Sequence, residues 1–577
     1  MFKLLKHLKP YRAYIALVLA LVFFQSLSEL FLPNLMADIV DTGIVKGDIS
    51  YILKVGGLML LVALAGTICA VLAGYFASKV AMGFGRILRL KVFSQVESFS
   101  FPEFNKLQTS SLITRTTNDI TQMQQLVMVM LRMMVSAPMM CIGGIIMAVN
   151  KDAKLSLIIV VIVPILMVAI YLLTKKSVPL FKALQVKLDR LNLVLREYLT
   201  GVRVIRAFNR VSYEEKRFQE ANQDLTKTAV RVFQIMAALM PFMMLLLNLT
   251  TLVIIWFGGI RIDNGYMQVG DLMAFIQYIM QIMFSLLMFS MMFVMIPRAS
   301  ASATRINEVF DTAPSIVDSD VVKDDAGNRG RGQIEFNEVT FSYPGAEKPA
   351  LKNISFMALP GKTTAIIGGT GSGKSSLLSL LMRFYDLASG SILIDGVDIR
   401  EISQQSLRAK IGYVPQKPIL FTGTIADNIR YGKEDATEAE IWQAAEIAQA
   451  REFIDSMEDG INSYIAQGGT NISGGQKQRL SMARALVRRP KIYAFDDSFS
   501  ALDFKTDAKL RLALKQETLE ATVLIIAQRV STVMDADQIV VLDEGEIVGL
   551  GKHKELLHSC HVYREIVQSQ LSGEELA

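Results

Sequence analysis

The stretch from Gly368 to Ser375 has the residue types and spacing of a phosphate-binding loop. It fits G-x-x-x-x-G-K-[ST] at each fixed position, and the apolar run before it (Thr364–Ile367) predicts a buried strand. The apolar residues from Leu377 onward predict the helix that such a loop requires. In these loops backbone N–H groups converge on phosphate oxygens, a lysine reaches the β- and γ-phosphates, and a hydroxyl binds Mg²⁺. The loop therefore predicts a nucleoside triphosphate site, with Lys374 on the phosphates and Ser375 on Mg²⁺.

Two further patterns belong to nucleotide chemistry. An apolar strand at 491–497 ends in Asp496, which is placed to hold the same Mg²⁺, and Asp497, where a hydrolase places its general base. Ser473-Gly-Gly-Gln476 opens a predicted helix, another arrangement that binds phosphate. One γ-phosphate does not need two phosphate-binding motifs. We therefore expect Ser473–Gln476 to bind a nucleotide held by another subunit.

The elements that position these residues follow from composition. With 577 residues the chain is too long for one core, so several domains are expected. The net charge of +6 is small for this length, which argues against a nucleic-acid binder. The three cysteines, Cys69, Cys141 and Cys560, lie far apart and predict packing roles in a reducing compartment.

Apolar segments dominate the first three hundred or so residues, and each is long enough for the ~20 residues that cross a bilayer. They predict six spans, at 14–35, 52–76, 127–149, 155–173, 233–260 and 272–296. Lys and Arg concentrate in the two long segments at 78–125 and 175–231, which are therefore cytoplasmic. Both termini, the phosphate loop and everything after Pro297 then lie in the cytoplasm. The long segments are helical in pattern and continue the spans into the cytosol.

Polar and methionine residues inside the spans point to a ligand path. A charged side chain at membrane depth is costly unless it faces a water-filled cavity, and the polar residues there are Gln25, Glu29, Asn34, Asp38, Asn248 and Gln277. Methionine is enriched at 280–295, which suits varied apolar ligands as well as plain packing between helices.

These motifs resemble those of half-transporters of the ATP-binding cassette (ABC) exporter family, along essentially the whole chain. The resemblance rests on Gly368–Ser375, Gln416 in Tyr413-Val-Pro-Gln416, the signature Ile472–Gln476, the Walker B Asp496, and Ser500-Ala-Leu-Asp503. It implies a membrane all-α domain of six helices extended into the cytosol (1–310), a linker (311–332) and a soluble α/β P-loop nucleotide-binding domain (333–577). Polar interruptions near 104–117 and 207–213 would be coupling helices.

The resemblance also assigns roles. Tyr343 would stack on adenine, and Gln416 would link Mg²⁺ to the membrane domain. Two chains would pair head to tail, each phosphate loop facing the other chain's signature. The residues expected to bind ATP are Tyr343, Gly368, Thr370, Gly371, Ser372, Gly373, Lys374, Ser375, Ser376 and Gln416 in the chain's own site, and Ser473, Gly474, Gly475 and Gln476 in the partner's. Catalytic roles fall to Asp497, Gln528 and Gln416, and the expected metal ligands are Ser375, Gln416 and Asp496.

Two departures from the family pattern concern hydrolysis. Asp497 replaces the usual Glu, and a displacement of about 1 Å can cost on the order of 10²-fold in rate. Gln528 replaces the switch His, and an amide can bind a γ-phosphate but cannot carry charge or move a proton. A third departure is Gln467, where the family commonly has Glu. The signature itself is nearly intact, with Ile472 for Leu.

This asymmetry indicates the degenerate-site subunit of a bacterial heterodimeric multidrug exporter. We expect ATP-driven export of hydrophobic or amphipathic compounds across the cell membrane, with ATP and Mg²⁺ as cofactors. The chain's own ATP site would be impaired, and its signature would complete the competent site of a second half-transporter. The alternatives are a homodimeric exporter of lipid or peptide and an ATP-gated membrane regulator without transport. We predict no nucleic-acid partner.

Overall fold

The computed structural model describes residues 1–318 and 330–570, which form two compact units. One unit comprises Met1–Glu97 and Thr109–Thr312, and the other comprises Ser98–Gln108 and Ala313–Ala577. Residues 319–329, the greater part of the predicted linker 311–332, lie outside the described residues. The bounds 1–310, 311–332 and 333–577 stay predictions.

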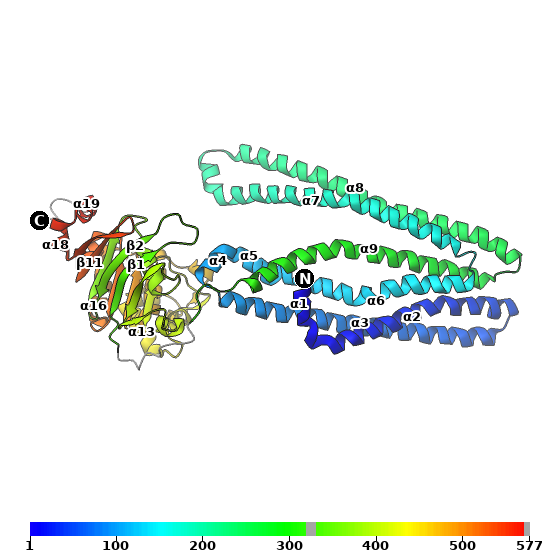
Figure 1. Ribbon diagram of the computed structural model, residues 1–577, viewed down its shortest axis with the longest axis horizontal. Coiled ribbons are helices and arrows are strands. Elements are labelled where there is room, and N and C mark those ends of the chain that lie inside the picture. The colour runs from blue at the N-terminus through cyan, green and yellow to red at the C-terminus, as the bar shows by residue number, and fades with distance from the viewer. Residues whose placement is uncertain (319–329, 571–577) are drawn as a thin grey trace. The chain divides into compact units, whose positions relative to one another are not determined.

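Six long helices build the first unit (Figure 1). Five contain a predicted span whole, and α7 begins two residues after the start of the span predicted at 155–173. They are α2 (Arg12–Asp38), α3 (Ile49–Glu97), α6 (Ile120–Lys151), α7 (Leu157–Ala207), α8 (Val211–Asp263) and α9 (Val269–Asp311). At ~1.5 Å per residue, α8 is about 80 Å long, whereas a bilayer core is ~30 Å thick. The prediction that the membrane helices continue far beyond the bilayer is therefore confirmed. Short helices α1 (Phe2–Leu5) and α5 (Thr109–Thr114) also belong to this unit.

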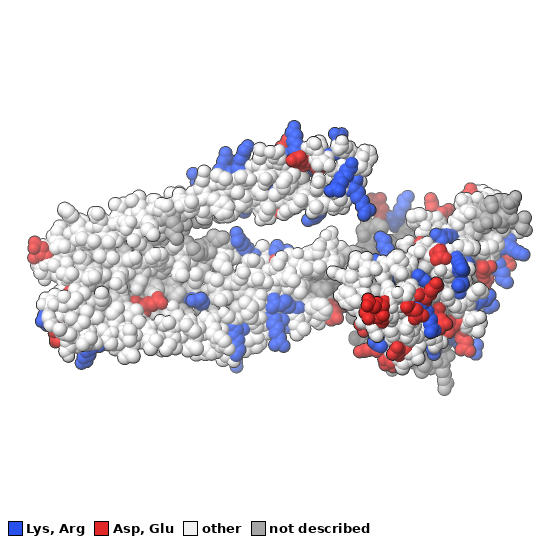
Figure 2. Space-filling view, turned by 180° about the vertical axis from the view of Figure 1, so that it is seen from behind, with Lys and Arg blue, Asp and Glu red and all other residues white. Residues whose placement is uncertain are grey.

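Apolar side chains cover much of the outer surface of this unit. Leu60, Val160 and Trp256 are about seven-tenths exposed, at 71%, 68% and 68%. Figure 2 shows one half of the helical unit nearly free of charged residues on the face drawn. An apolar surface of this extent is unstable in water and matches lipid chains, and helices satisfy their own backbone groups there.

Ion pairs join the helices of this unit at both ends of the apolar region. At the cytoplasmic end the buried Asp119 binds Arg305 of α9 and accepts a hydrogen bond from Ser302 at 2.9 Å. At the other end Asp152 binds Arg261 of α8. Because these charges lie beyond the apolar segments, they fix helix neighbours without placing a charge in the bilayer.

Two sheets form the framework of the second unit. A four-stranded antiparallel sheet has the order β2-β1-β4-β5, and a six-stranded sheet has the order β12-β11-β3-β10-β9-β6 and is parallel except for β12. Every residue of β9 and of β10 is buried, as expected for parallel strands covered on both faces. The strands are β1 (Ile334–Phe341), β2 (Leu351–Ala358), β3 (Thr363–Gly368), β4 (Ser389–Ile394), β5 (Val397–Asp398), β6 (Ile411–Val414), β9 (Ile492–Asp496), β10 (Thr522–Ile526), β11 (Gln538–Asp543) and β12 (Glu546–Gly551), with a separate pair β7 (Gly423–Thr424) and β8 (Tyr464–Ile465).

Helices pack around these sheets on two apolar cores. One core lies between the two sheets and includes α10, and the other joins the six-stranded sheet to a helical subdomain that includes α13 and α15. The helices are α10 (Lys374–Leu381), α11 (Gln404–Ala409), α12 (Ile425–Arg430), α13 (Glu438–Ile447), α14 (Arg451–Asp455), α15 (Gly474–Leu486), α16 (Phe504–Glu517), α17 (Val530–Val533), α18 (His553–Ser559) and α19 (His561–Gln570). This α/β architecture confirms the predicted fold class.

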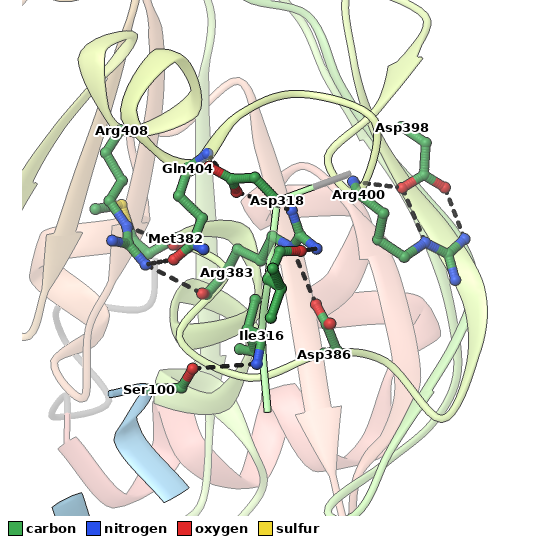
Figure 3. Close-up of polar contacts among 11 residues, drawn as sticks. Ser100, Ile316, Asp318, Met382, Arg383, Asp386, Asp398, Arg400, Gln404 and Arg408 are labelled. Atoms are coloured by element: carbon green, nitrogen blue, oxygen red, sulfur yellow. Dashed lines mark hydrogen bonds and ion pairs between the residues drawn. The ribbon is translucent and has the colours of Figure 1, made fainter. Parts of the chain in front are cut away.

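A short helix from the first half of the chain belongs to this second unit. Helix α4 (Phe101–Leu107) begins with a capping box between Ser100 and Glu103. The Ser100 hydroxyl accepts a hydrogen bond from the Ile316 amide at 3.2 Å (Figure 3). Two residues further on, the Asp318 carboxylate accepts one from the Gln404 amide at 3.0 Å. The first residues after α9 are therefore held on the nucleotide-binding unit together with α4.

Candidate functional site

The predicted nucleotide residues follow four neighbouring parallel strands. In the order β3-β10-β9-β6, the phosphate loop follows β3, Gln528 follows β10, Asp497 follows β9 and Gln416 follows β6. The registers place Ile526 beside both Asp496 and Ile366, so the strands end at one edge. Ligands of open α/β sheets bind beyond such carboxyl ends. The topology thus gathers residues that span more than a hundred positions of sequence.

The phosphate loop needs glycine for two different reasons. At Gly373 the backbone is left-handed (φ 97°), and an added Cβ would lie 2.7 Å from the Ala350 carbonyl oxygen. At Gly368 a Cβ would lie 2.1 Å from the Leu542 carbonyl oxygen. No larger residue fits either position. Thr370 and Gly371 at the loop tip are exposed, whereas Ser372 and Ser376 are buried at its base.

The Lys374 side chain lies inside this loop and bonds to its backbone. Its Nζ donates to the carbonyl oxygens of Gly368 at 2.9 Å and Gly369 at 2.6 Å. Burial lowers the pKa of the ammonium, while the carboxylates of Asp497 and Asp496 oppose that shift. The cation thus lies inside the loop, where a ligand of the β- and γ-phosphates is required.

Two of the three predicted protein ligands of Mg²⁺, Ser375 and Asp496, lie side by side. Ser375 Oγ donates to Asp496 Oδ1 at 3.0 Å, and Asp496 is 6% exposed. Burial raises the pKa of Asp496, and Asp497 adds to the rise. Within the described residues no group of three or more His, Cys, Asp or Glu side chains is arranged to hold a metal ion. One carboxylate and one hydroxyl fit Mg²⁺, which usually keeps several waters and takes other oxygens from phosphates.

Asp497 is held by the two glutamines that the sequence singled out. Its Oδ2 accepts from Gln416 Nε2 at 3.2 Å and from Gln528 Nε2 at 3.1 Å. The Asp497 backbone is left-handed (φ 46°), an unusual conformation for a residue other than glycine. Its amide donates to the Ile526 carbonyl at 2.8 Å, which ties the turn to β10. The predicted base and both predicted auxiliary residues therefore form one hydrogen-bonded group.

Tyr343 lies between the phosphate loop and a second tyrosine. Its hydroxyl forms a hydrogen bond with Ser376 Oγ at 2.9 Å, and its ring packs edge-on to Tyr385 with centroids 5.2 Å apart. Tyr385 in turn accepts a hydrogen bond from Asn105 Nδ2 of α4 at 3.1 Å. Burial raises the pKa of Tyr385. Sequence reasoning missed Tyr385, because no motif links it to either neighbour.

The signature residues form the start of a helix, at which Ser473 and Gly474 are exposed. Ser473 caps α15. Its Oγ accepts a hydrogen bond from the backbone N–H of Gln476 at 3.3 Å, and its own backbone N–H donates to Gln476 Oε1 at 2.8 Å. At Gly474 an added Cβ would meet no atom within 4 Å. In the described part of the chain, no hydrogen bond connects Ser473–Gln476 with the phosphate loop. The fold thus brings the residues of the chain's own site together and leaves the signature open.

Comparisons with known proteins agree with this architecture. Residues 15–286 match the model of the ABC transporter transmembrane region, and residues 351–500 match that of the ABC transporter. An uncharacterized ABC transporter ATP-binding protein of Mycobacterium tuberculosis is 44% identical over 98% of this chain and 97% of its own length. A fatty acid ABC transporter ATP-binding/permease protein of Mycobacterium bovis is 35% identical over 84% of this chain and 76% of its own length.

A solved structure extends the likeness to the whole fold. The structure of a bacterial Atm1-family ABC exporter with ATP bound superposes with a TM-score of 0.80 at 27% identity, over 97% of this chain and 98% of that one. One conclusion follows from the six apolar helices, the cytoplasmic α/β domain that binds ATP, and the matches along nearly the full length of the chain. The chain belongs to the ABC transporter family and is an exporter half-transporter, a multi-pass membrane protein with a transporter ATPase domain.

Proposed function

We propose that this chain is one half of a heterodimeric exporter and carries the weaker of its two ATP sites. The observation that carries the proposal is the group formed by Asp497, Gln416 and Gln528, in which one carboxylate oxygen accepts two amide hydrogen bonds. Both donors are neutral at all physiological pH values, so neither supplies charge or a proton to the hydrolytic step. Asp497 is also shorter than the glutamate expected there.

The chain's own site retains what is needed to hold a nucleotide. Lys374 lies within the phosphate loop, and Ser375 and Asp496 form a pair that would hold Mg²⁺. Tyr343 is 37% exposed beside Ser376 and would stack on adenine. When bound, Mg²⁺ would neutralise charge on the β- and γ-phosphates. The proposal is thus tight ATP binding with slow hydrolysis.

The signature supports a role in a partner's site. Ser473 and Gly474 are exposed at a capped helix N-terminus, where amide groups favour negative charge. Half-transporters act as dimers, so this surface needs a second chain. We propose that it completes the competent site of a different half-transporter, whose base and switch histidine perform the turnover.

The proposed cargo is a hydrophobic or amphipathic compound, exported from the cytoplasmic side of the cell membrane as in multidrug efflux. The apolar, methionine-containing membrane helices support this class.

The test compares ATP hydrolysis by the chain alone with that of the chain co-expressed with the second half-transporter. We expect slow hydrolysis by the lone chain and fast hydrolysis by the pair, abolished when the partner's base is replaced. Fast hydrolysis by the lone chain would contradict the proposal, and so would full activity of the pair without the partner's base.

A homodimeric lipid exporter is the second candidate, favoured by the relative named as a fatty acid transporter. Mass determination of the chain purified from its native membrane separates the two. A species with two copies of this chain that transports lipid and hydrolyses ATP would establish the homodimer.

A further inference from the structure

A cavity of about 670 Å³ lies among helices α2, α6 and α9 of the membrane unit. Its wall is largely apolar, and methionines contribute much of it, namely Met128, Met133, Met140, Met280 and Met288. Ligand sites for small molecules usually enclose ~300–1,000 Å³, and methionine adapts to flexible apolar groups. The cavity therefore has the size and wall to hold a single apolar chain.

Two charged side chains line this cavity, and only one of them already has a partner. Glu29 Oε1 accepts a hydrogen bond from Gln25 Nε2 at 2.9 Å. Gln281 Nε2 donates to the Glu29 carbonyl oxygen at 3.1 Å. Glu29 Oε1 thus has a partner within the chain, whereas Gln281 Oε1 is buried without one among the described residues.

Arg132 is different. It lines the cavity from α6, and in the part of the chain that the structure describes it forms no hydrogen bond and no ion pair. A cation within an apolar segment is unfavourable unless it faces a cavity and meets an anion there. The sequence gives one signal for it, an arginine inside the span predicted at 127–149, which the motif analysis passed over.

The two charged residues lie at different levels of the cavity. Glu29 precedes Leu30, whose Cδ1 would lie 2.4 Å from a Cβ added at Gly143 of α6. Arg132 is eleven residues earlier on α6, so the two levels differ by about 16 Å along the helix. Because α6 runs outward from the cytoplasm, Arg132 lies on the cytoplasmic side of Glu29, and Met128 and Val129 line the cavity beyond it.

We infer that this cavity binds an amphiphile with an anionic head group, carboxylate or phosphate, and one apolar chain. The head would accept hydrogen bonds from the Arg132 guanidinium, whose planar donors fit both anions. The chain would extend along the methionine wall toward Glu29. This inference names the substrate class and rests on the proposed export of amphipathic compounds.

The opposite polarity is a cationic amphiphile with its head on Glu29. That arrangement would compete with the Gln25 amide for the carboxylate and would leave Arg132 without an anion. The structure favours the anionic ligand for both reasons.

The experiment measures binding without ATP, using the full chain in nanodiscs of phosphatidylcholine. A dansyl-labelled fatty acid serves as the probe, and dodecanoate, dodecyl phosphate and dodecyltrimethylammonium compete for it. We expect Arg132→Gln to weaken binding of the probe and of the stronger anionic competitor by about tenfold or more, as loss of a charged hydrogen-bond donor predicts. Arg132→Lys should recover part of the affinity.

Arg86→Gln serves as the matched control. It removes an arginine of the same unit that does not line the cavity, and it should leave the affinity unchanged. The affinities of dodecanoate and dodecyl phosphate are then compared. The competitor that binds more tightly identifies the head group as carboxylate or phosphate.

Unchanged probe affinity in Arg132→Gln, with the variant folded, would overturn the inference. Tighter binding of dodecyltrimethylammonium than of either anion, lost in Glu29→Gln, would also overturn it. Since no step of the assay needs hydrolysis or a second chain, a failure of the heterodimer proposal would appear only in the ATPase assay.

Discussion

The hydrogen bonds around Asp497 explain how two departures from the family pattern act at one point. Gln528 follows β10 and Asp497 follows β9, and the amide of one binds the carboxylate of the other at 3.1 Å. A protonated histidine at position 528 would bring a charge and a transferable proton to the same place, whereas the glutamine amide brings neither. The two substitutions are therefore coupled and should be tested together.

Asp497→Glu combined with Gln528→His should increase hydrolysis at this chain's site. We expect the hydrolysis rate to increase by about tenfold or more. The longer glutamate side chain would bring the carboxylate closer to the attacking water, and the histidine could transfer a proton. The measurement is phosphate release by the assembled pair after the partner's own base has been replaced, so that only this site contributes.

Lys374→Ala added to the double variant provides the control and should abolish the gain. Equal rates in the double variant and the parent would show that other residues limit this site.

Lys374→Ala in the parent chain should weaken ATP binding at the chain's own loop. Nζ reaches two loop carbonyls at 2.9 and 2.6 Å, which places it to donate to phosphate oxygens instead. Charged hydrogen bonds contribute ~1.5–3 kcal/mol, so the dissociation constant should rise by about 10- to 100-fold. Equilibrium binding of a fluorescent ATP analogue measures this, and an unchanged constant would remove Lys374 from the site.

At the scale of elements, α4 connects to the ATP site through aromatic side chains of the nucleotide-binding unit. The Phe101 ring lies 4.5 Å from Phe384 and 6.3 Å from Tyr385, measured between centroids. Tyr385 packs against Tyr343, whose hydroxyl bonds to Ser376 behind the phosphate loop. A displacement of α4 therefore reaches the residue expected to stack on adenine through two ring contacts.

Phe101→Ala should reduce the stimulation of ATPase activity by transported compounds while leaving ATP affinity unchanged. Aromatic pairs contribute ~0.5–1.5 kcal/mol beyond area burial, so we expect a fall of about two- to tenfold in stimulation. The assay is ATPase activity of the assembled transporter with and without a transported amphiphile.

Lys106→Ala on the same helix is the matched control. Lys106 is exposed and has no hydrogen bond or ion pair among the described residues, so its removal should change nothing. Equal losses in Phe101→Ala and Lys106→Ala would mean that α4 acts without the aromatic contacts.

At the scale of the whole molecule, the open signature predicts where a second chain must bind. Gly474 is the first residue of α15, and a methyl group there would meet nothing within 4 Å in this chain. Gly474→Ala should therefore leave the fold intact and even favour the helix by up to ~1 kcal/mol. If the partner's phosphates approach this backbone, the same methyl group should lower hydrolysis by the pair at least about tenfold, since misplacement of about 1 Å has costs of that size.

Thermal unfolding and ATPase activity of the pair are measured on the same samples. Gly57→Ala is the control, because a Cβ at Gly57 of α3 also meets no atom within 4 Å. Unchanged ATPase activity in Gly474→Ala would indicate that this surface does not face a nucleotide.

The sequence by itself determined the local machinery and the membrane topology. These features are short-range patterns in the sequence: the spacing Gly368–Lys374–Ser375, the strand that ends at Asp496, and the six apolar segments. The first two specify a local backbone geometry, and the apolar segments specify a lipid environment. The fold class follows from them because a bilayer admits only helices here and a phosphate loop requires a strand and a helix beside it.

Only the tertiary structure decided which distant residues meet. It placed the Gln528 amide on Asp497, Tyr385 between Asn105 and Tyr343, α4 in the second unit, and Arg132 in a cavity with Glu29. The partners in these contacts come from different strands and helices, so no spacing along the chain encodes them. Strand order and helix packing set those distances, and both depend on the chain as a whole.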